Sequence, residues 1–283
     1  MISTINLTKI YSNGVYALID LTVDIKSKRV AVLGRNGAGK TTLIRILSTQ
    51  LKPTRGTALI FGYDIIKDKD KVRKLIASIP QEARPVMIAS PYEHVFMYLT
   101  ARGYSLHEAK ELTRKALKEI GLWEYRDHPT EDLSGGMKRK VFLAMAIASN
   151  AELIFLDEPT TGLDPVSRLE TWYIIKNLSS KIILTTHYID EAESLSEEVI
   201  ILHKGRLVEK GNVKDLLKKF DGKVRIEGFG NIRIGNTRIS YVNKEEAKKY
   251  IELGATIKPI TLEDILIMHG VTDDENRYSS EEY

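Results

Sequence analysis

The stretch Gly34-Arg35-Asn36-Gly37-Ala38-Gly39-Lys40-Thr41 decides the fold of this 283-residue chain. The apolar run Arg29–Leu33 before it predicts a buried strand, and the segment Thr41–Ser48 after it predicts a helix. A strand, a glycine-rich turn and a helix in this order, with the spacing G-x-x-x-x-G-K-T, form a P-loop. The glycines let successive backbone N–H groups turn toward phosphates, and the positive N-terminal end of the helix adds to the same anion site.

The P-loop predicts binding of ATP together with Mg²⁺. Lys40 is expected to reach the β- and γ-phosphates, and the Thr41 hydroxyl is expected to ligate the metal. A match of this kind arises by chance in a chain of this length roughly once in a hundred, and the flanking strand and helix make accident a weak explanation. The expected nucleotide-contacting residues here are Gly34, Arg35, Asn36, Gly37, Ala38, Gly39, Lys40, Thr41 and Thr42.

An acidic pair ends a second apolar strand. Leu153–Leu156 is followed by Asp157, expected to hold the Mg²⁺ shell directly or through water, and by Glu158, expected to polarise the water that attacks the γ-phosphate. A strand followed by a solvated acidic turn is common, and taken alone it would explain these residues equally well. Beside a P-loop, the functional interpretation is the stronger one.

Short apolar runs alternate with helical patterns and predict a parallel α/β sheet. Further strands are expected at Lys181–Thr185 and at Val199–Leu202, the latter followed by a hairpin-like return through Lys204-Gly205. Between residues 85 and 150 the pattern changes to helices. There Ser105-x-x-Glu108 predicts a capping box, so we expect an inserted helical subdomain.

The pattern changes again near Phe220. Apolar residues alternate with polar ones from Val224 to Tyr241, with glycines at turns, which predicts a small β-meander. Asn243-x-x-Glu246 and Thr261-x-x-Asp264 predict two helix starts, and the acidic tail 273–283 is expected to be frayed. The expected domains are 1–220 and a small α+β domain with the tail at 221–283. Two interpretations of the latter stay open: a regulatory or small-ligand module, and an element that braces a dimer or stabilises the fold.

Composition excludes several classes of function. The chain has no cysteine, which rules out disulfides, zinc fingers and thiol catalysis. A formal net charge of +4 without a basic stripe does not favour nucleic acid as a partner. The chain begins without a secretory signal and contains no apolar run long enough to span a bilayer. We therefore expect a cytoplasmic protein whose membrane spans, if any are needed, come from a partner.

A third motif, Leu133-Ser134-Gly135-Gly136-Met137, brings in a family resemblance. Ser134 before two glycines and a helix predicts another N-terminal anion site. The order of P-loop, this motif and the acidic pair resembles ATP-binding cassette (ABC) proteins, in which it is the signature motif. The resemblance implies a RecA-like P-loop NTPase core with an antiparallel β subdomain and an inserted helical subdomain. It also implies that two protomers close head to tail, with Ser134, Gly135 and Gly136 of one capping the γ-phosphate bound by the other.

Further single residues match motifs of the same family. Gln81 resembles the Q-loop glutamine, which contacts magnesium and senses the transmembrane partner, and Gly162-Leu163-Asp164 resembles the D-loop. His187 matches the histidine that contacts the γ-phosphate, although a lone histidine at a strand end is more often structural. Tyr11 resembles the aromatic residue that stacks on adenine, with Tyr16 close by.

The chain departs from the family pattern after the signature. Met137 stands where glutamine is commoner, which affects a peripheral contact only. The basic run Lys138-Arg139-Lys140 is most simply a solvated helix face, with attraction to phosphate or a membrane surface as the alternative.

Three stretches resemble the drug- and lipid-exporter branch of the family, the daunorubicin-resistance type: Lys52–Thr57, Phe61–Asp64 and Pro259–Asp264. The resemblance implies the ATP-hydrolysing subunit of an exporter, peripheral at the cytoplasmic face of the membrane, which drives a separate transmembrane permease subunit. It implies a homodimer, or a heterodimer with a second cassette. The alternative is a soluble ABC ATPase acting on ribosomes or DNA. The single cassette, and the absence of long coiled coils and zinc-binding cysteines, argue against that alternative.

Overall fold

The computed structural model of the protein describes residues 1–269, so the acidic tail expected at 273–283 lies outside the described residues. The chain folds as two compact units, Met1–Glu209 and a second that begins at Lys210.

A six-stranded sheet with the order β10-β9-β3-β8-β7-β6 lies in the first unit, except that β10 continues past the last residue of that unit, Glu209. Its strands are β3 (Arg29–Leu33), β6 (Ile76–Ile79), β7 (Leu153–Asp157), β8 (Lys181–Thr186), β9 (Glu198–His203) and β10 (Arg206–Asn212). The five strands from β9 to β6 pair in parallel, which confirms the expected parallel sheet. Leu33 lies opposite Thr186, and Asp157 lies opposite Thr185. The carboxyl ends of β3, β7 and β8 therefore meet at one edge of the sheet.

A second sheet, with the order β2-β1-β4-β5, forms the expected antiparallel subdomain. Its strands are β1 (Ile2–Ile10), β2 (Tyr16–Ile25), β4 (Arg55–Ile60) and β5 (Tyr63–Asp64), and all neighbours run antiparallel.

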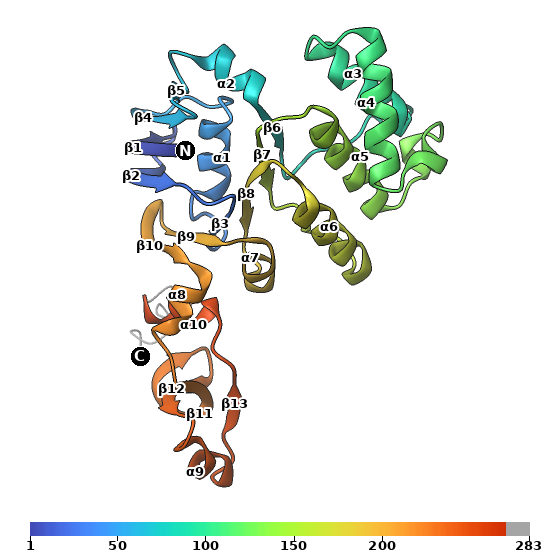
Figure 1. The fold of residues 1–283 in the computed structure, drawn as a ribbon. Coiled ribbons are helices and arrows are strands. Elements are labelled where there is room, and N and C mark those ends of the chain that lie inside the picture. The colour runs from blue at the N-terminus through green and yellow to red at the C-terminus, as the bar shows by residue number, and fades with distance from the viewer. Residues whose placement is uncertain (270–283) are drawn as a thin grey trace. The chain divides into compact units, whose positions relative to one another are not determined.

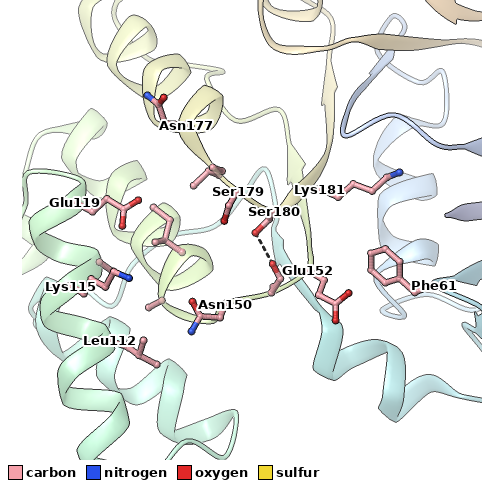
Figure 2. A pocket seen from close by; sticks show the side chains of 15 residues that line it. Phe61, Leu112, Lys115, Glu119, Asn150, Glu152, Asn177, Ser179, Ser180 and Lys181 are labelled. Carbon is pink, nitrogen blue, oxygen red and sulfur yellow. Dashed lines mark hydrogen bonds between the residues drawn. The ribbon is translucent and has the colours of Figure 1, made fainter.

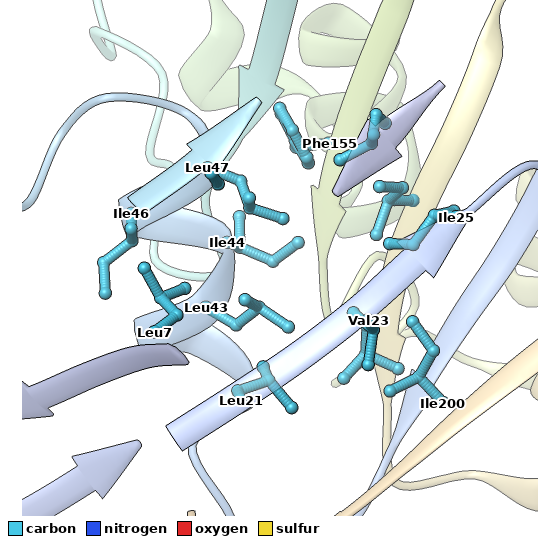
Figure 3. Packing of buried hydrophobic residues seen from close by; sticks show 14 of the residues in the cluster. Leu7, Leu21, Val23, Ile25, Leu43, Ile44, Ile46, Leu47, Phe155 and Ile200 are labelled. Atoms are coloured by element: carbon cyan, nitrogen blue, oxygen red, sulfur yellow. The ribbon is translucent and has the colours of Figure 1, made fainter. Parts of the chain in front are cut away.

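Helix α1 (Lys40–Leu47) packs between the two sheets and forms the core of the unit. Its side chains Leu43, Ile44, Ile46 and Leu47 are buried against residues of β1, β2, β7 and β9 (Figure 3). Figure 1 shows α1 on one side of the six-stranded sheet, with α6 (Pro165–Asn177) and α7 (Ile189–Leu195) on the other. Because the helix is buried on several sides, the P-loop at its start rests on a rigid support.

The expected helical block has a hydrophobic core of its own. It consists of α3 (Pro91–Ala101), α4 (Leu106–Glu119), the 3₁₀ turns η1 (Trp123–Tyr125) and η2 (Thr130–Asp132), and α5 (Gly135–Ala148), while α2 (Lys69–Leu75) precedes it. The capping box expected at Ser105 and Glu108 is present in both directions. Within residues 1–269, no helix combines the length and apolarity that crossing a bilayer requires.

The second unit is an α+β fold, and its sheet corrects one expectation. It contains α8 (Val213–Lys218), β11 (Lys223–Ile234), β12 (Thr237–Asn243), α9 (Ala247–Glu252), β13 (Thr256–Lys258) and α10 (Leu262–Met268). The meander prediction was wrong: Gly228 and Gly230, expected at a turn, lie inside the long strand β11 at a register shift, so residues 224–241 form a two-stranded hairpin of β11 and β12. After α9 the chain adds β13 on the other side of β11, which gives the order β12-β11-β13. Sequence alternation identifies strands, but the partner of a strand depends on contacts between distant residues.

The two helix starts predicted in this unit had different outcomes. Thr261 caps α10 and forms a capping box with Asp264, as expected. Helix α9 begins only at Ala247, after Glu246, and no side chain in the described part of the chain caps it, so the predicted cap at Asn243 was wrong. Asn243 instead ends β12 and accepts a hydrogen bond from the Glu246 N–H through its backbone carbonyl.

Candidate active site

The P-loop lies between the end of β3 and the start of α1. Gly39 has a φ of 101°, and a Cβ at this position would lie 2.3 Å from the carbonyl oxygen of Ala17 on β2. A side chain would therefore be excluded both by backbone conformation and by space. Among the described residues, no side chain caps α1, so the N–H groups of its first turn remain available to an anion.

Lys40 is 5% exposed and turns back over the loop. Its Nζ donates to the carbonyl oxygens of Gly34, at 2.8 Å, and Arg35, at 3.3 Å. It also forms an ion pair of 3.1 Å with Oε1 of Glu158, whose side chain is equally buried. The lysine is therefore held within the loop, and its counter-charge is the carboxylate at the end of β7.

Thr41 and Asp157 place two oxygen ligands side by side. The Thr41 hydroxyl donates to Oδ1 of Asp157 at 3.1 Å, and the Thr185 hydroxyl of β8 donates to the same oxygen at 2.5 Å. In nucleotide sites Mg²⁺ is held by one or two protein oxygens together with substrate phosphates, and not by a cage of carboxylates. No group of three or more acidic, His or Cys side chains that could form such a cage occurs in residues 1–269. The donors present thus fit a nucleotide-bound Mg²⁺.

Glu158 adopts a left-handed backbone conformation, with φ 49°. Its N–H donates to the carbonyl and hydroxyl oxygens of Thr185. Its Oε2 accepts a bond of 3.0 Å from the Thr161 hydroxyl and lies 2.6 Å from Nδ1 of His187. A non-glycine residue in this conformation costs about 1–3 kcal/mol and occurs preferentially at functional sites. The strained backbone aims the carboxylate at Lys40 and His187 rather than into solvent.

Tyr11 and Gln81 differ in how closely they approach the P-loop. The Tyr11 hydroxyl lies 3.1 Å from that of Thr42 in the first turn of α1, while Tyr16 points outward and is 59% exposed. Gln81 follows β6 at the correct edge of the sheet and is exposed. In the described part of the chain, its side chain forms no hydrogen bond to Thr41 or Asp157.

The signature motif begins α5. Ser134 caps the helix, its hydroxyl accepting from the Met137 N–H at 3.2 Å. A Cβ on Gly136 would lie 2.4 Å from Oγ of Ser167, which explains the glycine, whereas a Cβ on Gly135 would meet open space. Ser134 and Gly135 are exposed. Figure 1 shows α5 and α1 on different sides of the six-stranded sheet, so a single chain does not bring the signature to its own P-loop.

The interpretation of Lys138-Arg139-Lys140 as a solvated face was wrong for Arg139. Its guanidinium donates to the carbonyl oxygens of Pro159 at 2.9 Å, Asp157 at 3.2 Å and Pro80 at 3.3 Å. Arg139 therefore connects, through these hydrogen bonds, the segment that follows β6 with the end of β7 that carries the acidic pair. Burial lowers the pKa of Arg139, and the negative charges of Asp157 and Glu191 oppose that shift.

A cavity of about 690 Å³ lies away from this site (Figure 2). Glu152, Ser180 and Lys181 line it, next to the amino ends of β7 and β8. The P-loop follows the carboxyl end of β3, which runs parallel to β8. The cavity therefore opens at the opposite edge of the sheet and is not the nucleotide site.

Comparison with known proteins agrees with this geometry. Residues 18–161 match the family model described as ABC transporter. The chain is 35% identical over 262 residues to the daunorubicin/doxorubicin resistance ATP-binding protein DrrA of Streptomyces peucetius, an alignment that covers 90% of this chain and 76% of that protein. It is 37% identical over 204 residues to the phospholipid-transporting ATPase ABCA3 of Rattus norvegicus, covering 71% of this chain but only 12% of that protein.

Solved structures of cassettes share the fold. The ATP-binding cassette MJ0796, solved as a dimer in a post-hydrolysis state with ADP and Pi, superimposes with a TM-score of 0.68 at 28% identity, covering 75% of this chain and 98% of that one. The cbiO1 protein of Clostridium perfringens, part of the ABC transporter complex cbiONQ, gives a TM-score of 0.67 at 30% identity, with coverages of 78% and 94%. These similarities confirm the predicted fold class.

Proposed function

Because this chain belongs to the ABC transporter ATPase family, we propose that it is the ATP-hydrolysing subunit of an exporter, that it works as a head-to-tail dimer, and that it drives a separate membrane subunit from the cytoplasmic face. The observation that carries the proposal is the cluster of Lys40, Glu158 and His187 around the P-loop. When phosphates enter the site, the buried lysine can bind them, and the carboxylate that it leaves can accept a proton.

The two oxygens of Glu158 have separate partners in this cluster. Oε2 is held by Thr161 and His187, whereas Oε1 pairs with Lys40. When Lys40 transfers to the phosphates, Oε1 loses its partner and becomes free to accept the proton of the attacking water. General-base help of this kind contributes about 10²- to 10⁴-fold in rate.

The other site residues bind and orient the nucleotide in this proposal. Thr41 and Asp157, with Gln81, would hold Mg²⁺, which when bound supplies positive charge to the β- and γ-phosphates. The Tyr11 ring stacks on adenine, and His187 contacts the γ-phosphate while keeping Glu158 in place.

The exposed signature supports the dimer. Ser134 and Gly135 lie at an exposed helix N-terminus that their own P-loop cannot use. A second copy placed head to tail would bring this N-terminus onto bound ATP, and the similar cassette MJ0796 is dimeric. A homodimer then has two equivalent sites, and a heterodimer with another cassette would satisfy the same geometry.

An exposed apolar loop supports the membrane partner. Val86, Met87 and Ile88 are 56%, 48% and 81% exposed, and they lie between Gln81 and α3. Consecutive exposed apolar residues mark interaction surfaces. The names of DrrA and ABCA3 refer to drug resistance and phospholipid transport, which favours export of amphipathic molecules. Neither name, nor the cbiONQ complex, favours action on ribosomes or DNA.

Co-purification tests the transport role. A tagged chain is expressed in its native cells, the membranes are solubilised gently, and co-purifying proteins are quantified. We expect a polytopic membrane protein at comparable stoichiometry, lost when Val86, Met87 and Ile88 are all replaced by serine. The matched control replaces Leu169 and Tyr173 by serine in the same way. These residues are 62% and 72% exposed on α6, and this variant should retain the membrane partner. Ribosomes, DNA or no membrane protein at all would overturn the transport role and leave the ATPase intact.

Glu158→Gln and Lys40→Ala test the site itself. Glu158→Gln should bind ATP, lose turnover by about 10²-fold or more and accumulate as a dimer, detectable by size exclusion with ATP present. Lys40→Ala should lose nucleotide affinity. Wild-type turnover in the first variant, or wild-type affinity in the second, would contradict the assigned roles.

A further inference from the structure

A second buried carboxyl group lies behind the candidate active site. Glu191 on α7 is 1% exposed. Its Oε1 accepts two hydrogen bonds, one of 2.7 Å from the Thr160 hydroxyl and one of 3.0 Å from the indole N–H of Trp172 on α6. Its Oε2 is also buried, and no hydrogen-bond partner for it occurs among residues 1–269.

The negative charge of this carboxyl group does not stabilise the fold. A buried polar atom without a partner loses its hydration and gains nothing in return. Burial raises the pKa of Glu191, the side chains of Thr186, Thr160 and Trp172 oppose this rise, and the charge of Glu158 adds to it. An apolar side chain of the same size would avoid the buried charge but would leave the Thr160 hydroxyl and the Trp172 N–H without an acceptor, so what position 191 supplies is the accepting oxygen.

The contacts of Glu191 lead to the catalytic carboxylate through one short turn. Thr160 and Thr161 are adjacent, yet their hydroxyls donate to different acids: Thr160 to Glu191 and Thr161 to Glu158. The Thr161 N–H also donates to the Glu158 carbonyl at 3.3 Å. The same turn contains the left-handed backbone of Glu158. A bond that fixes Thr160 therefore limits the directions in which Glu158 can point.

We propose that Glu191 is a positioning residue for ATP hydrolysis: it holds Thr160, and through the turn 158–161 it keeps Glu158 aimed at the attacking water. Trp172 donates to the same accepting oxygen and helps to hold it in place. The inference rests on the proposed role of Glu158 as general base. Hydrolysis then requires a hydrogen-bond acceptor at position 191. Neither a negative charge nor a side chain of the same size without an acceptor is sufficient.

Two substitutions at position 191 separate these requirements. Glu191→Gln keeps the accepting oxygen and removes the charge, so kcat should stay within about threefold of wild type. Glu191→Met keeps the volume and removes the acceptor, so kcat should fall about 10- to 100-fold, since small misplacements of a reacting group cost up to about 10²-fold. The KM for ATP should change by less than about twofold in both variants, because the oxygens of Glu191 that bond do so to Thr160 and Trp172 and not to the P-loop.

Variants of the two donors, Thr160 and Trp172, keep the proposal testable if the Glu191→Met protein does not fold. Thr160→Val and Trp172→Phe each remove one bond to Oε1, and each should lower kcat with unchanged KM. Thr171→Val is the matched control: it removes a hydroxyl from the neighbouring position on α6 that bonds to the Ser167 carbonyl instead, and it should turn over like wild type. Because Trp123 and Trp172 are the two tryptophans of the chain, a Trp123→Phe background makes emission a direct report on Trp172. In this background the emission of Glu191→Met should differ from that of the Trp123→Phe parent.

The outcomes discriminate between the hypotheses. Steady-state ATPase rates are measured for all variants beside Glu158→Gln. If Glu191→Met turns over within twofold of wild type, if it loses affinity rather than kcat, or if Thr171→Val is equally impaired, Glu191 does not position the turn. If Glu158→Gln itself retains turnover, the assigned role of Glu158 fails as well. Loss of turnover in Glu158→Gln with full activity in Glu191→Met overturns only the present inference.

Discussion

Glu158→Gln should strengthen the binding of ADP, because it releases Lys40. Lys40 pairs with Glu158 at 3.1 Å, and the two side chains are 5% and 4% exposed. A nucleotide must draw Lys40 away from this carboxylate. Glutamine leaves the lysine without its competing anion, so less free energy is lost when the phosphates take its place.

The size of the effect follows from the pair. At 3.1 Å and an effective dielectric constant of about 20, the Coulomb attraction is about 5 kcal/mol. Most of this is offset by the desolvation of both charges, which a buried pair has to overcome. A net gain of about 1–2 kcal/mol remains, which corresponds to a dissociation constant about 5- to 30-fold lower.

Isothermal titration with Mg-ADP measures this change. ADP is chosen because it lacks the γ-phosphate, which removes repulsion by Glu158 and the ATP-driven dimerisation that we propose. Wild type, Glu158→Gln, Lys40→Met and the double variant form a double-mutant cycle. The gain should appear with Lys40 present and vanish in the Lys40→Met background. An unchanged dissociation constant in Glu158→Gln, or a gain that persists without Lys40, would refute the reasoning.

Three further predictions concern neighbouring parts of the site. Gly39→Ala forces a side chain into a left-handed position, so it should destabilise the chain by more than about 1 kcal/mol and weaken ATP binding, as seen by calorimetry; unchanged thermal stability and affinity would argue against this P-loop geometry. Tyr11→Ala should lower ATP affinity roughly tenfold through lost stacking, measured by fluorescence titration with Tyr11→Phe as the near-neutral control, and equal losses in both would assign the contact to the hydroxyl. Burial raises the pKa of Glu191 above its ordinary value of 4.5, so the folded state binds the proton more tightly than the unfolded state. The free energy of unfolding therefore falls as the pH rises from about 4.5 to the higher pKa of the folded state. The charges of Glu158 and Arg139 that face Glu191 remain in the Glu191→Gln variant. Glu191→Gln should therefore gain thermal stability over wild type at pH 8 and less at pH 5, and a difference independent of pH would contradict the raised pKa.

The parts of the fold that were predictable from sequence are local in sequence. The P-loop is a strand, a turn and a helix in direct succession, so its residues identify it without reference to the rest of the chain. The buried parallel strands, such as Leu153–Asp157, are continuous apolar runs and are recognisable for the same reason. The capping boxes at Ser105 and Thr261 were equally accessible, because each depends on residues within one turn.

The residues that sequence analysis missed depend on contacts between distant segments. Arg139 has a basic residue on either side, and only the packing of α5 against the ends of β6 and β7 turns it inward. Helical spacing could have predicted this burial, because Arg139 lies on the same face of α5 as the buried residues Gly136 and Leu143. Glu191 follows Asp190 and suggests a solvated acidic stretch, although it shares a face with the buried Leu195.

The assigned roles of the site residues remain predictions, because they depend on ligands and partner chains as well as on contacts within this chain. The structure places Tyr11 beside Thr42, and Lys40 beside Glu158. The role of Gln81 depends on ligands and partners, and that of Ser134 depends on a second chain. A site shared between protomers cannot be assembled from the contacts of one chain.

The register of β7 couples nucleotide binding to the correct pairing of the sheet. Asp157 reaches Thr41 only because β7 lies beside β8 with Asp157 opposite Thr185. A slip of one residue turns every side chain of a strand to the other face, which would bury this carboxylate on the wrong side and leave Leu156 facing the P-loop. The nucleotide then selects the correctly paired sheet, and at a hundredfold excess over its dissociation constant it stabilises that form by about 2.7 kcal/mol. Bound nucleotide therefore stabilises the native register of β7 relative to a slipped one.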